Sequence, residues 1–256
     1  MKTLTEIVRT IDIRAPREVV FRYFTDSERF ARWWGQGSTV DPRPGGAVRI
    51  VNPGGVVAAG TFRELVPPER VVFTYGYEGG AHGIAPGTTT VTVTLDAIPE
   101  GTRVTLRHAG LPTEEAILEH TQGWRYQLSL FSKTVASEHF AGAAAVADQW
   151  FDAWAETDPA KRRALLEASA APEISFHDPF SALQGYDDLD AQIAAAQRFM
   201  PGTRLSRTGD PAISHGHALI RWEIRDPQGA TKGRGFNSVA FAPDGRLRSV
   251  VGFWEG

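Results

Sequence analysis

The sequence predicts an α+β protein of two domains, at 1–140 and 141–256. Its 256 residues are too many for one small domain and suit two. Strand-like runs dominate 47–108, and at Thr113 the period of the apolar residues changes from two to about 3.6. Beyond the alanine-rich segment 136–148, helical patterns begin again and more strand-like runs follow. Two successive sets of helices and strands indicate two folding units, each with its own core.

A strand and two short helices open the first domain. The isoleucines of 5–13 share one parity, as in a half-buried strand. Pro16 then begins a helix at its first position, where the missing N–H costs nothing. Asp26 or Ser27 caps a second helix, which ends at Gly35.

An antiparallel meander and one long helix complete this domain. Turn signals such as 67-PPE-69 and 99-PEG-101 separate the strand-like runs. The predicted strands are 47–51, 57–66, 71–77, 88–97 and 102–108. Thr113 caps the helix, and one apolar stripe from Ile117 to Val135 continues for about six turns.

The second domain places most of its helices before its strands. Helices are predicted at the end of the linker segment 136–148, at 159–170 and at 187–199. A strand at 173–177 and a loop at 178–185 separate the last two helices. Four longer strands follow, at 203–208, 212–225, 231–242 and 246–254. Short turns join the last three strands, which favours a curved antiparallel sheet.

Composition excludes several classes of function. The formal net charge is −3, and neither half has the basic excess that a nucleic-acid partner requires. With no cysteine, the chain has no disulfide, thiolate nucleophile or Cys-ligated zinc. Nucleotide and redox motifs are absent, so we expect no cofactor and no metal. Without a signal peptide or a run of about 20 apolar residues, a soluble cytoplasmic protein with no membrane partner is the default.

Trp33 and Trp34 stand side by side in the second short helix. Neighbours on a helix lie about 100° apart around its axis. The two rings therefore cannot both face the main core, and the sequence does not decide which one faces elsewhere.

Five ordered motifs across 5–138 resemble the START-like (SRPBCC) superfamily. They are VFRYFTDSERFARWWG, VDPRPGG, GTFRELVPPERVVFTY, TRVTLRH and the GW of the long helix. Within the superfamily, the match is to homologues of the heat-shock-protein ATPase activator. This resemblance implies a helix-grip, in which a curved antiparallel sheet wraps the long helix around an apolar cavity. Beside one of Trp33 and Trp34, the candidate cavity residues are Arg49, Tyr75, His108 and Trp124, with plain core as the alternative for Trp124.

The segment 143–254 resembles the SnoaL-like branch of the nuclear-transport-factor-2-like superfamily. The motifs that carry this are the helix with Trp150 and Trp154, then ISFHDPFSALQGYDDL, PGT, LIRWEI, GFNSVAF and DGRLRSVVGFW. The resemblance implies a cone-shaped α+β barrel around a second pocket. Candidate pocket residues are Trp150, Trp154, His177, Tyr186, Trp222 and Asn237. Some members are isomerases, cyclases or hydrolases, so the fold leaves function open.

Asp178 is the candidate catalytic residue. The resemblance to the isomerase members implies a general base here, acting on a carbon next to a carbonyl. Alternatively, Asp178 caps the turn that Asp-Pro commonly starts. Asn237 stands where SnoaL-like sequences often carry Asp, and an amide cannot act as a general acid or base. The acid–base pair is therefore incomplete unless the Tyr186 side chain rotates into the pocket and supplies the second group.

His215 and His217 form an H-x-H pair that we place on one strand face. Two such histidines can coordinate a metal, but structural and catalytic zinc sites need three or four protein ligands. A third ligand is not evident in the sequence. A solvated strand face is the preferred interpretation.

Three functions remain open. The first is binding of small hydrophobic or aromatic molecules in two internal cavities, without established catalysis. The second is an isomerase or cyclase that uses Asp178 on a polyketide- or steroid-like substrate. The third is a chaperone-associated interaction protein. We also expect a homodimer through the sheet face of the second domain, where Phe241 and Phe253 are predicted to be exposed.

Overall fold

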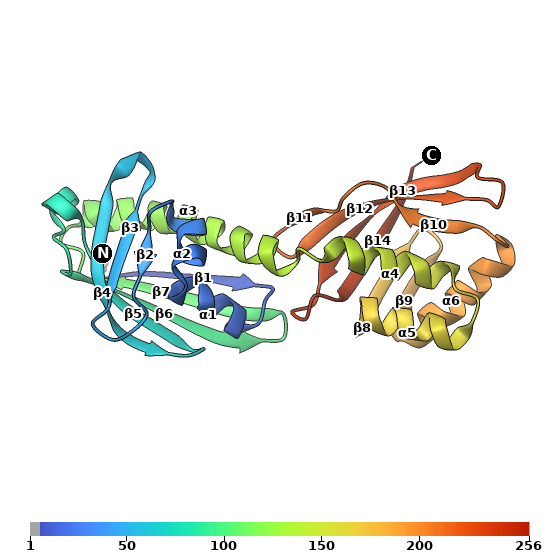
Figure 1. Ribbon diagram of the computed structural model, residues 1–256, viewed down its shortest axis with the longest axis horizontal. Coiled ribbons are helices and arrows are strands. Elements are labelled where there is room, and N and C mark those ends of the chain that lie inside the picture. Colours follow the sequence, from blue (N-terminus) through green and yellow to red (C-terminus); the bar gives the residue numbers. More distant parts are fainter. Residues whose placement is uncertain (1–5, 256) are drawn as a thin grey trace. The chain divides into compact units, whose positions relative to one another are not determined.

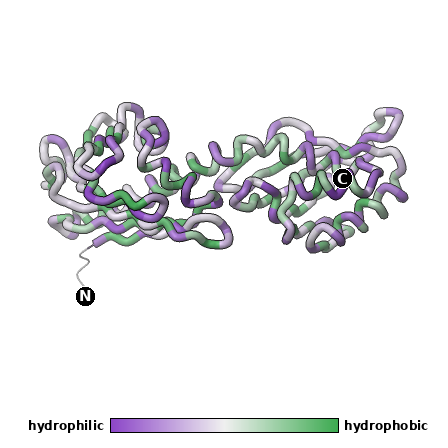
Figure 2. Tube along the Cα trace, turned by 60° about the horizontal axis from the view of Figure 1, so that its bottom comes forward, coloured by the Kyte–Doolittle hydropathy of each residue, from purple (hydrophilic) through white to green (hydrophobic). Residues whose placement is uncertain are grey.

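The computed structural model describes residues 6–255 (Figure 1). Contacts divide the chain into two compact units, of which the first ends at Val135 and the second begins at Ala136. Among the described residues, each unit contains one seven-stranded sheet. Hydrophobic and hydrophilic stretches alternate along the trace in both units (Figure 2). No helix in the described part is long and apolar enough to cross a membrane.

The first unit is an antiparallel sheet packed with a long helix. Its strands are ordered β1-β7-β6-β5-β4-β3-β2, and every neighbouring pair is antiparallel. The elements in chain order are β1 (Glu6–Ile13), α1 (Arg17–Thr25), α2 (Ser27–Trp34), β2 (Thr39–Val40), β3 (Ala47–Val51), the 3-10 turn η1 (Pro53–Gly55), β4 (Val57–Val66), β5 (Arg70–Tyr75), the 3-10 turn η2 (Glu78–Gly83), β6 (Thr89–Ile98), β7 (Gly101–Ala109) and α3 (Glu114–His139). Residue 5 of the predicted first strand lies outside the described range.

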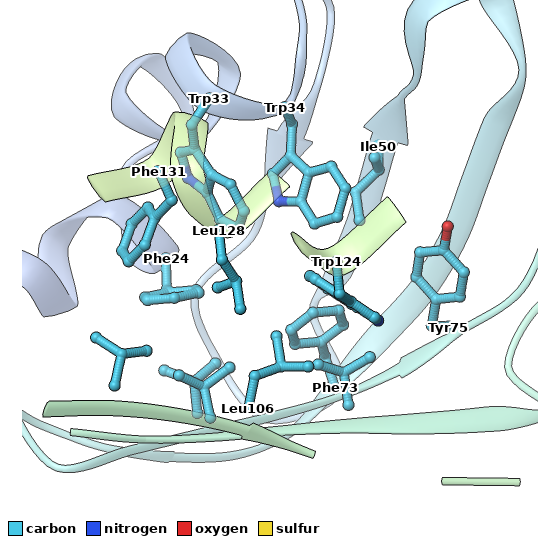
Figure 3. Close-up of a cluster of buried hydrophobic side chains, with 14 of the residues drawn as sticks. Phe24, Trp33, Trp34, Ile50, Phe73, Tyr75, Leu106, Trp124, Leu128 and Phe131 are labelled. Atoms are coloured by element: carbon cyan, nitrogen blue, oxygen red, sulfur yellow. The ribbon is translucent and has the colours of Figure 1, made fainter. Parts of the chain in front are cut away.

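Local signals in the sequence explain where these helices begin. The Asp26 side chain accepts a hydrogen bond from the Arg29 backbone N–H and so caps α2. The Thr113 hydroxyl does the same for the Ala116 N–H at the start of α3. From there the predicted stripe of α3 is buried, with Trp124, Leu128 and Phe131 in the core of the first unit. Figure 3 shows these side chains above the sheet residues Phe73 and Leu106.

The second unit combines helices with a mixed sheet. Its elements are α4 (Ala143–Ala155), α5 (Pro159–Ser169), β8 (Ala170–Asp178), β9 (Ser181–Gln184), α6 (Gly185–Phe199), β10 (Arg204–Arg207), β11 (Ala212–Ser214), β12 (His217–Arg225), β13 (Thr231–Phe241) and β14 (Leu247–Glu255). The strand order is β10-β12-β13-β14-β8-β9, with β11 also paired to β12. The prediction of a purely antiparallel sheet is wrong, because β8 and β14 run parallel. Short turns fix the direction of neighbouring strands, but they do not determine the distant partner of β8.

Other local predictions for the second unit also need correction. The predicted loop at 178–185 contains β9, which folds back on the end of β8. The predicted strand at 212–225 is broken by a turn in which His215 has φ 49°. His215 and His217 therefore do not share one strand face. Phe241 is fully buried and stacks on Phe140, because a register shift after Ala240 turns this end of β13 inward.

Candidate functional site

The first unit has a solvent-open cavity of about 290 Å³ between the sheet and α3. Its described lining residues are Trp34, Asn52, Tyr75, Tyr77, His82, Glu119, His120, Gly123, Trp124, Tyr126 and Gln127. They come from the end of α2, from the turn after β3, from β5 and the segment after it, and from one face of α3. The volume is close to the lower end of the range of about 300–1,000 Å³ typical of small-molecule sites. The space therefore suits a small organic molecule.

Both neighbouring tryptophans are buried in the core of the first unit, so the expectation that they cannot both face it is wrong; Trp34 also lines the cavity. Trp33 donates from Nε1 to the Tyr23 carbonyl at 3.1 Å and packs on Phe131 with ring centroids 4.7 Å apart. Trp34 lines the cavity and meets Trp124 edge to face at 5.4 Å. The Trp34 Nε1 is buried and has no hydrogen-bond partner among the described residues. Figure 3 shows Trp33 beside Phe131, and Trp34 above Trp124.

A chain of hydrogen bonds behind the cavity fixes the position of Trp124. The Trp124 Nε1 donates to His108 Nδ1 at 3.0 Å, so that nitrogen carries no proton. The neutral ring must then hold its proton on Nε2, which donates to Thr89 Oγ1 at 2.8 Å. Thr89 in turn donates to the Tyr75 carbonyl at 2.8 Å. Burial, followed by repulsion from His120, lowers the pKa of His108 to about 3, so this imidazole is a neutral positioning group.

Tyr75, Tyr77 and His120 form the polar wall of the cavity. His120 Nδ1 lies 2.8 Å from the Ala116 carbonyl and must donate to it, which leaves Nε2 to accept from the Tyr77 hydroxyl at 3.0 Å. Tyr75 in turn donates to Tyr77 and accepts from Asn52. Burial raises the pKa of both tyrosines and lowers that of His120. The wall is therefore uncharged, and its protons are held internally.

A contact between His82 and Glu119 lies at the edge of this cavity. His82 Nδ1 lies 2.8 Å from Glu119 Oε2, and both side chains are about half exposed. Arg49 is not among the described lining residues. Its guanidinium donates to the Gly37 carbonyl at 3.1 Å and lies 4.0 Å from the Glu78 carboxylate. Arg49 therefore brings no positive charge to the cavity wall.

The second unit contains a smaller cavity of about 90 Å³. Its described lining residues are Trp150, Trp154, Phe176, Asp178, Ala196, Gln197, Met200, Thr203, Leu205, Trp222, Ile224, Asn237, Gly252 and Trp254. Trp150 and Trp154 share one face of α4, because residues four apart are neighbours on a helix. Trp222 comes from the inward-facing side of β12, and Trp254 from the end of β14. Four indole rings thus surround one small space.

Three adjacent strands place Asp178 and Asn237 on either side of a glycine. Asn237 of β13 pairs with Gly252 of β14, and the parallel β8 brings Asp178 to the other side of the same glycine. A Cβ at Gly252 would lie 3.3 Å from both the Asn237 Oδ1 and the Asp178 Cβ. The absence of a side chain at 252 therefore keeps the space between the two polar groups open.

The polar groups of this cavity have local partners. The Asp178 Oδ1 accepts from the Phe180 backbone N–H at 2.9 Å, which is the turn-capping role considered for an Asp-Pro sequence. The Trp222 Nε1 donates to the Asn237 Oδ1 at 3.0 Å, so the NH₂ group of this amide remains to donate. Asp178 makes no ion pair with any described Lys, Arg or His. The polar side chains of the described lining are the Asp178 carboxylate, the Asn237 and Gln197 amides and the Thr203 hydroxyl. None of the last three is hydrogen-bonded to Asp178, whose described hydrogen bond is to the Phe180 N–H.

Several predicted site residues lie away from the two cavities. His108 stands behind Tyr75 and Trp124 rather than on the wall. His177 is exposed on β8, and the Tyr186 hydroxyl donates to the Ala170 carbonyl at 2.7 Å. Neither of these two is among the described lining residues of the second cavity. In the described part of the chain, no group of three or more His, Asp or Glu side chains could hold a metal ion.

Other cavity residues were not predicted. Tyr77, His82 and His120 come from a strand end, a glycine-rich turn and a helix, and no motif links these positions. The spacing of His120 and Trp124, four apart on one helix, could have suggested a shared face. Trp254 and Gly252 alternate on the final strand, which also points both toward the pocket side of the sheet.

Comparison with known proteins identifies the first unit. Residues 14–136 match the family model described as Activator of Hsp90 ATPase homolog 1-like protein, and this part of the chain is an AHSA1-like (SRPBCC) domain. Curated proteins give no match.

Solved structures cover about half of the chain. An AHSA1-like protein from Rhizobium etli is 33% identical over 51% of this chain and 81% of its own, with a TM-score of 0.43. A protein from Agrobacterium tumefaciens, described as a candidate isomerase of the SnoaL-like family, is 29% identical over 44% of this chain and 96% of its own, with a TM-score of 0.42. The Aha1 dimer from Colwellia psychrerythraea is 18% identical over 49% of this chain and 91% of its own, with a TM-score of 0.43.

Proposed function

We propose that the protein binds small hydrophobic or aromatic molecules in its internal cavities, with the helix-grip cavity of the first unit as the main site. Domains of this family generally bind ligands. The observation that carries the proposal is the cavity of about 290 Å³ lined by Trp34, Tyr75 and Trp124. Aromatic walls with a few fixed polar groups are typical of sites for such molecules.

The polar wall supports a neutral guest in this cavity. The Tyr75, Tyr77 and His120 side chains satisfy one another, so an apolar ring entering the space leaves none of these contacts unmade. The buried Trp34 Nε1–H is the exception, because it has no described acceptor. An unsatisfied buried donor costs about 1–3 kcal/mol, which a ligand oxygen would relieve. A planar molecule with one hydrogen-bond acceptor therefore fits best.

Gly123 provides a direct test of this site. It lies in α3 on the cavity wall, and a Cβ there would meet no atom within 4 Å. A Gly123→Leu variant therefore adds a bulky side chain at the cavity wall with room for its Cβ, and it replaces a glycine that weakens the helix by about 1 kcal/mol. We expect it to fold at least as stably and to lose binding of the neutral fluorescent probe N-phenyl-1-naphthylamine. Gly123→Ala is the matched control, because the methyl group leaves the cavity open.

Two outcomes decide the proposal for the first unit. Probe binding that is equal in wild type and Gly123→Leu would contradict it. Native mass spectrometry of the freshly purified protein provides an independent measurement, because a retained small molecule would identify the ligand class directly. Gly123→Leu should then retain less of that molecule than Gly123→Ala.

We further propose that the second unit is a SnoaL-like cone with its own ligand pocket, and that it binds rather than reacts. Asp178 faces Asn237, which cannot trade a proton, across Gly252. The cavity of about 90 Å³ is also small for a steroid- or polyketide-like substrate. Both observations favour binding.

The alternative is an isomerase or cyclase with Asp178 as general base, and the position of Asp178 on the pocket wall is its support. An Asp178→Asn variant would then lose turnover of a steroid- or polyketide-like ketone while its ligand affinity stays within about tenfold of wild type. Turnover that survives this change would rule the alternative out.

A further inference from the structure

We propose that the second cavity binds a methylated ammonium group, with Asp178 as its counter-ion and the surrounding indole rings as its cage. This inference depends on the proposal that the cavity holds a ligand at all, and it names the chemistry of that ligand. It gives Asp178 a binding role in place of the catalytic one.

The charge on the described cavity wall is negative. Asp178 is the single charged side chain among the described lining residues, which include no Lys, Arg or His. It is partly buried, and no described cationic side chain pairs with it. A carboxylate removed from water in this way is stabilised by an opposite charge a few Å away. The guest is the group that can supply this charge.

The rings around Asp178 also favour a positively charged guest. Trp150, Trp154, Trp222 and Trp254 all line the cavity. The Trp222 and Trp254 rings are inclined by 78° and the Trp150 and Trp154 rings by 62°, with centroids 5.1 and 6.1 Å apart. Rings set at steep angles can surround one group from several sides. Indole has the most negative ring face of the side chains, and cages of such rings recognise quaternary ammonium ligands.

The indole-rich wall favours methyl groups over N–H on the guest, because a ring face attracts a cation without a directed hydrogen bond. The Asn237 Oδ1 already accepts from Trp222, and one Asp178 oxygen accepts from the Phe180 N–H. A primary ammonium needs three acceptors, whereas a trimethylammonium needs none. The volume of about 90 Å³ corresponds to roughly three waters, which suits a head group of this size.

Choline and its neutral isostere 3,3-dimethyl-1-butanol test the inference. They have the same shape and differ by one positive charge. We expect isothermal titration calorimetry on the full chain at pH 7 to give an affinity for choline at least roughly tenfold higher. Ethanolamine, which carries the charge without the methyl groups, should bind more weakly than choline.

Variants separate the charge from the cage. Asp178→Asn keeps the acceptor for the Phe180 N–H and removes the charge, so choline should weaken roughly tenfold while dimethylbutanol does not change. Trp154→Phe loses no hydrogen bond, because the Trp154 Nε1 has no described partner. It should lower the preference for choline over dimethylbutanol. Asp210→Asn is the control, since the Asp210 side chain is 97% exposed and lies off the cavity.

The outcomes distinguish this inference from the proposed function. If dimethylbutanol binds as tightly as choline, the ammonium inference is wrong and ligand binding by the cavity stands. If neither compound binds, both proposals for this cavity are wrong. Choline binding that is unchanged in Asp178→Asn would overturn the counter-ion role.

Discussion

Acidification should destabilise the first unit through His108. The folded pKa of this imidazole is about 3, against 6.5 for an unperturbed histidine. Above pH 6.5 neither state binds the proton, so His108 does not affect the pH dependence of stability there. As the pH falls below 6.5, His108 binds a proton in the unfolded chain but not in the folded unit, so the free energy of unfolding decreases. Between pH 7 and pH 5 this single group accounts for a loss of about 2 kcal/mol in the free energy of unfolding.

The His108→Phe variant isolates this contribution. It is less stable at both pH values, because the Trp124 Nε1–H loses its acceptor. Its free energy of unfolding should nevertheless fall by about 2 kcal/mol less than that of wild type between pH 7 and pH 5. The assay is a urea titration at pH 7 and another at pH 5. At each urea concentration the protein receives a brief pulse of deuterium labelling in one common buffer. The deuterium uptake of peptides from β6 and β7 then gives the folded fraction. An equal pH dependence in the two proteins would refute the assignment of a neutral, buried His108.

Three further predictions concern the two cavities and their supports. Thr89→Val leaves the His108 Nε2–H and the Tyr75 carbonyl without their shared partner and should lower the free energy of unfolding by roughly 3 kcal/mol in the same urea assay. A smaller effect, under about 0.5 kcal/mol, would contradict the hydrogen-bond chain. Trp33→Phe, which loses the bond to Tyr23, should cost about 2 kcal/mol, whereas Trp34→Phe should stay within about 1 kcal/mol of wild type. The reverse order would show that the two rings have been assigned wrongly. Gly252→Ala should weaken choline binding and leave the naphthylamine probe unaffected, because the new methyl group lies 3.3 Å from the Asn237 Oδ1 in the second cavity; calorimetry and probe fluorescence measure the two effects.

Periodicity and caps were enough to predict most of the fold. The helix from Thr113 and the strands of the first unit are close to the observed α3 and β3–β7, because buried side chains enforce a period of 3.6 or 2 on these segments. The parallel pairing of β8 with β14 was not predictable in this way. It joins residues far apart in the chain, and no turn sequence records it. The turn at His215 and Gly216, both at positive φ, was also missed, although a glycine that interrupts a strand-like run is a turn signal.

The site was harder to predict than the fold. Trp124, Tyr75, Asp178 and Asn237 were identified because each lies in or beside a recognisable motif. Arg49 was expected in the first cavity, but it is an exposed residue in the middle of β3, on the face opposite the buried Val48 and Ile50, and it bonds the Gly37 carbonyl. The partners that determine the chemistry, such as the Thr89 hydroxyl beside His108, come from different strands. Their roles depend on distances and proton positions that no linear pattern contains.

The tandem indoles of α2 give the protein an optical reporter of its own. The ring centroids of Trp33 and Trp34 lie 4.6 Å apart at an inclination of 35°, close enough for their electronic transitions to couple. Trp33 is held in the interior, so any rotation of Trp34 by an arriving guest changes the angle of the pair. Circular dichroism in the near ultraviolet can therefore follow occupancy without a label.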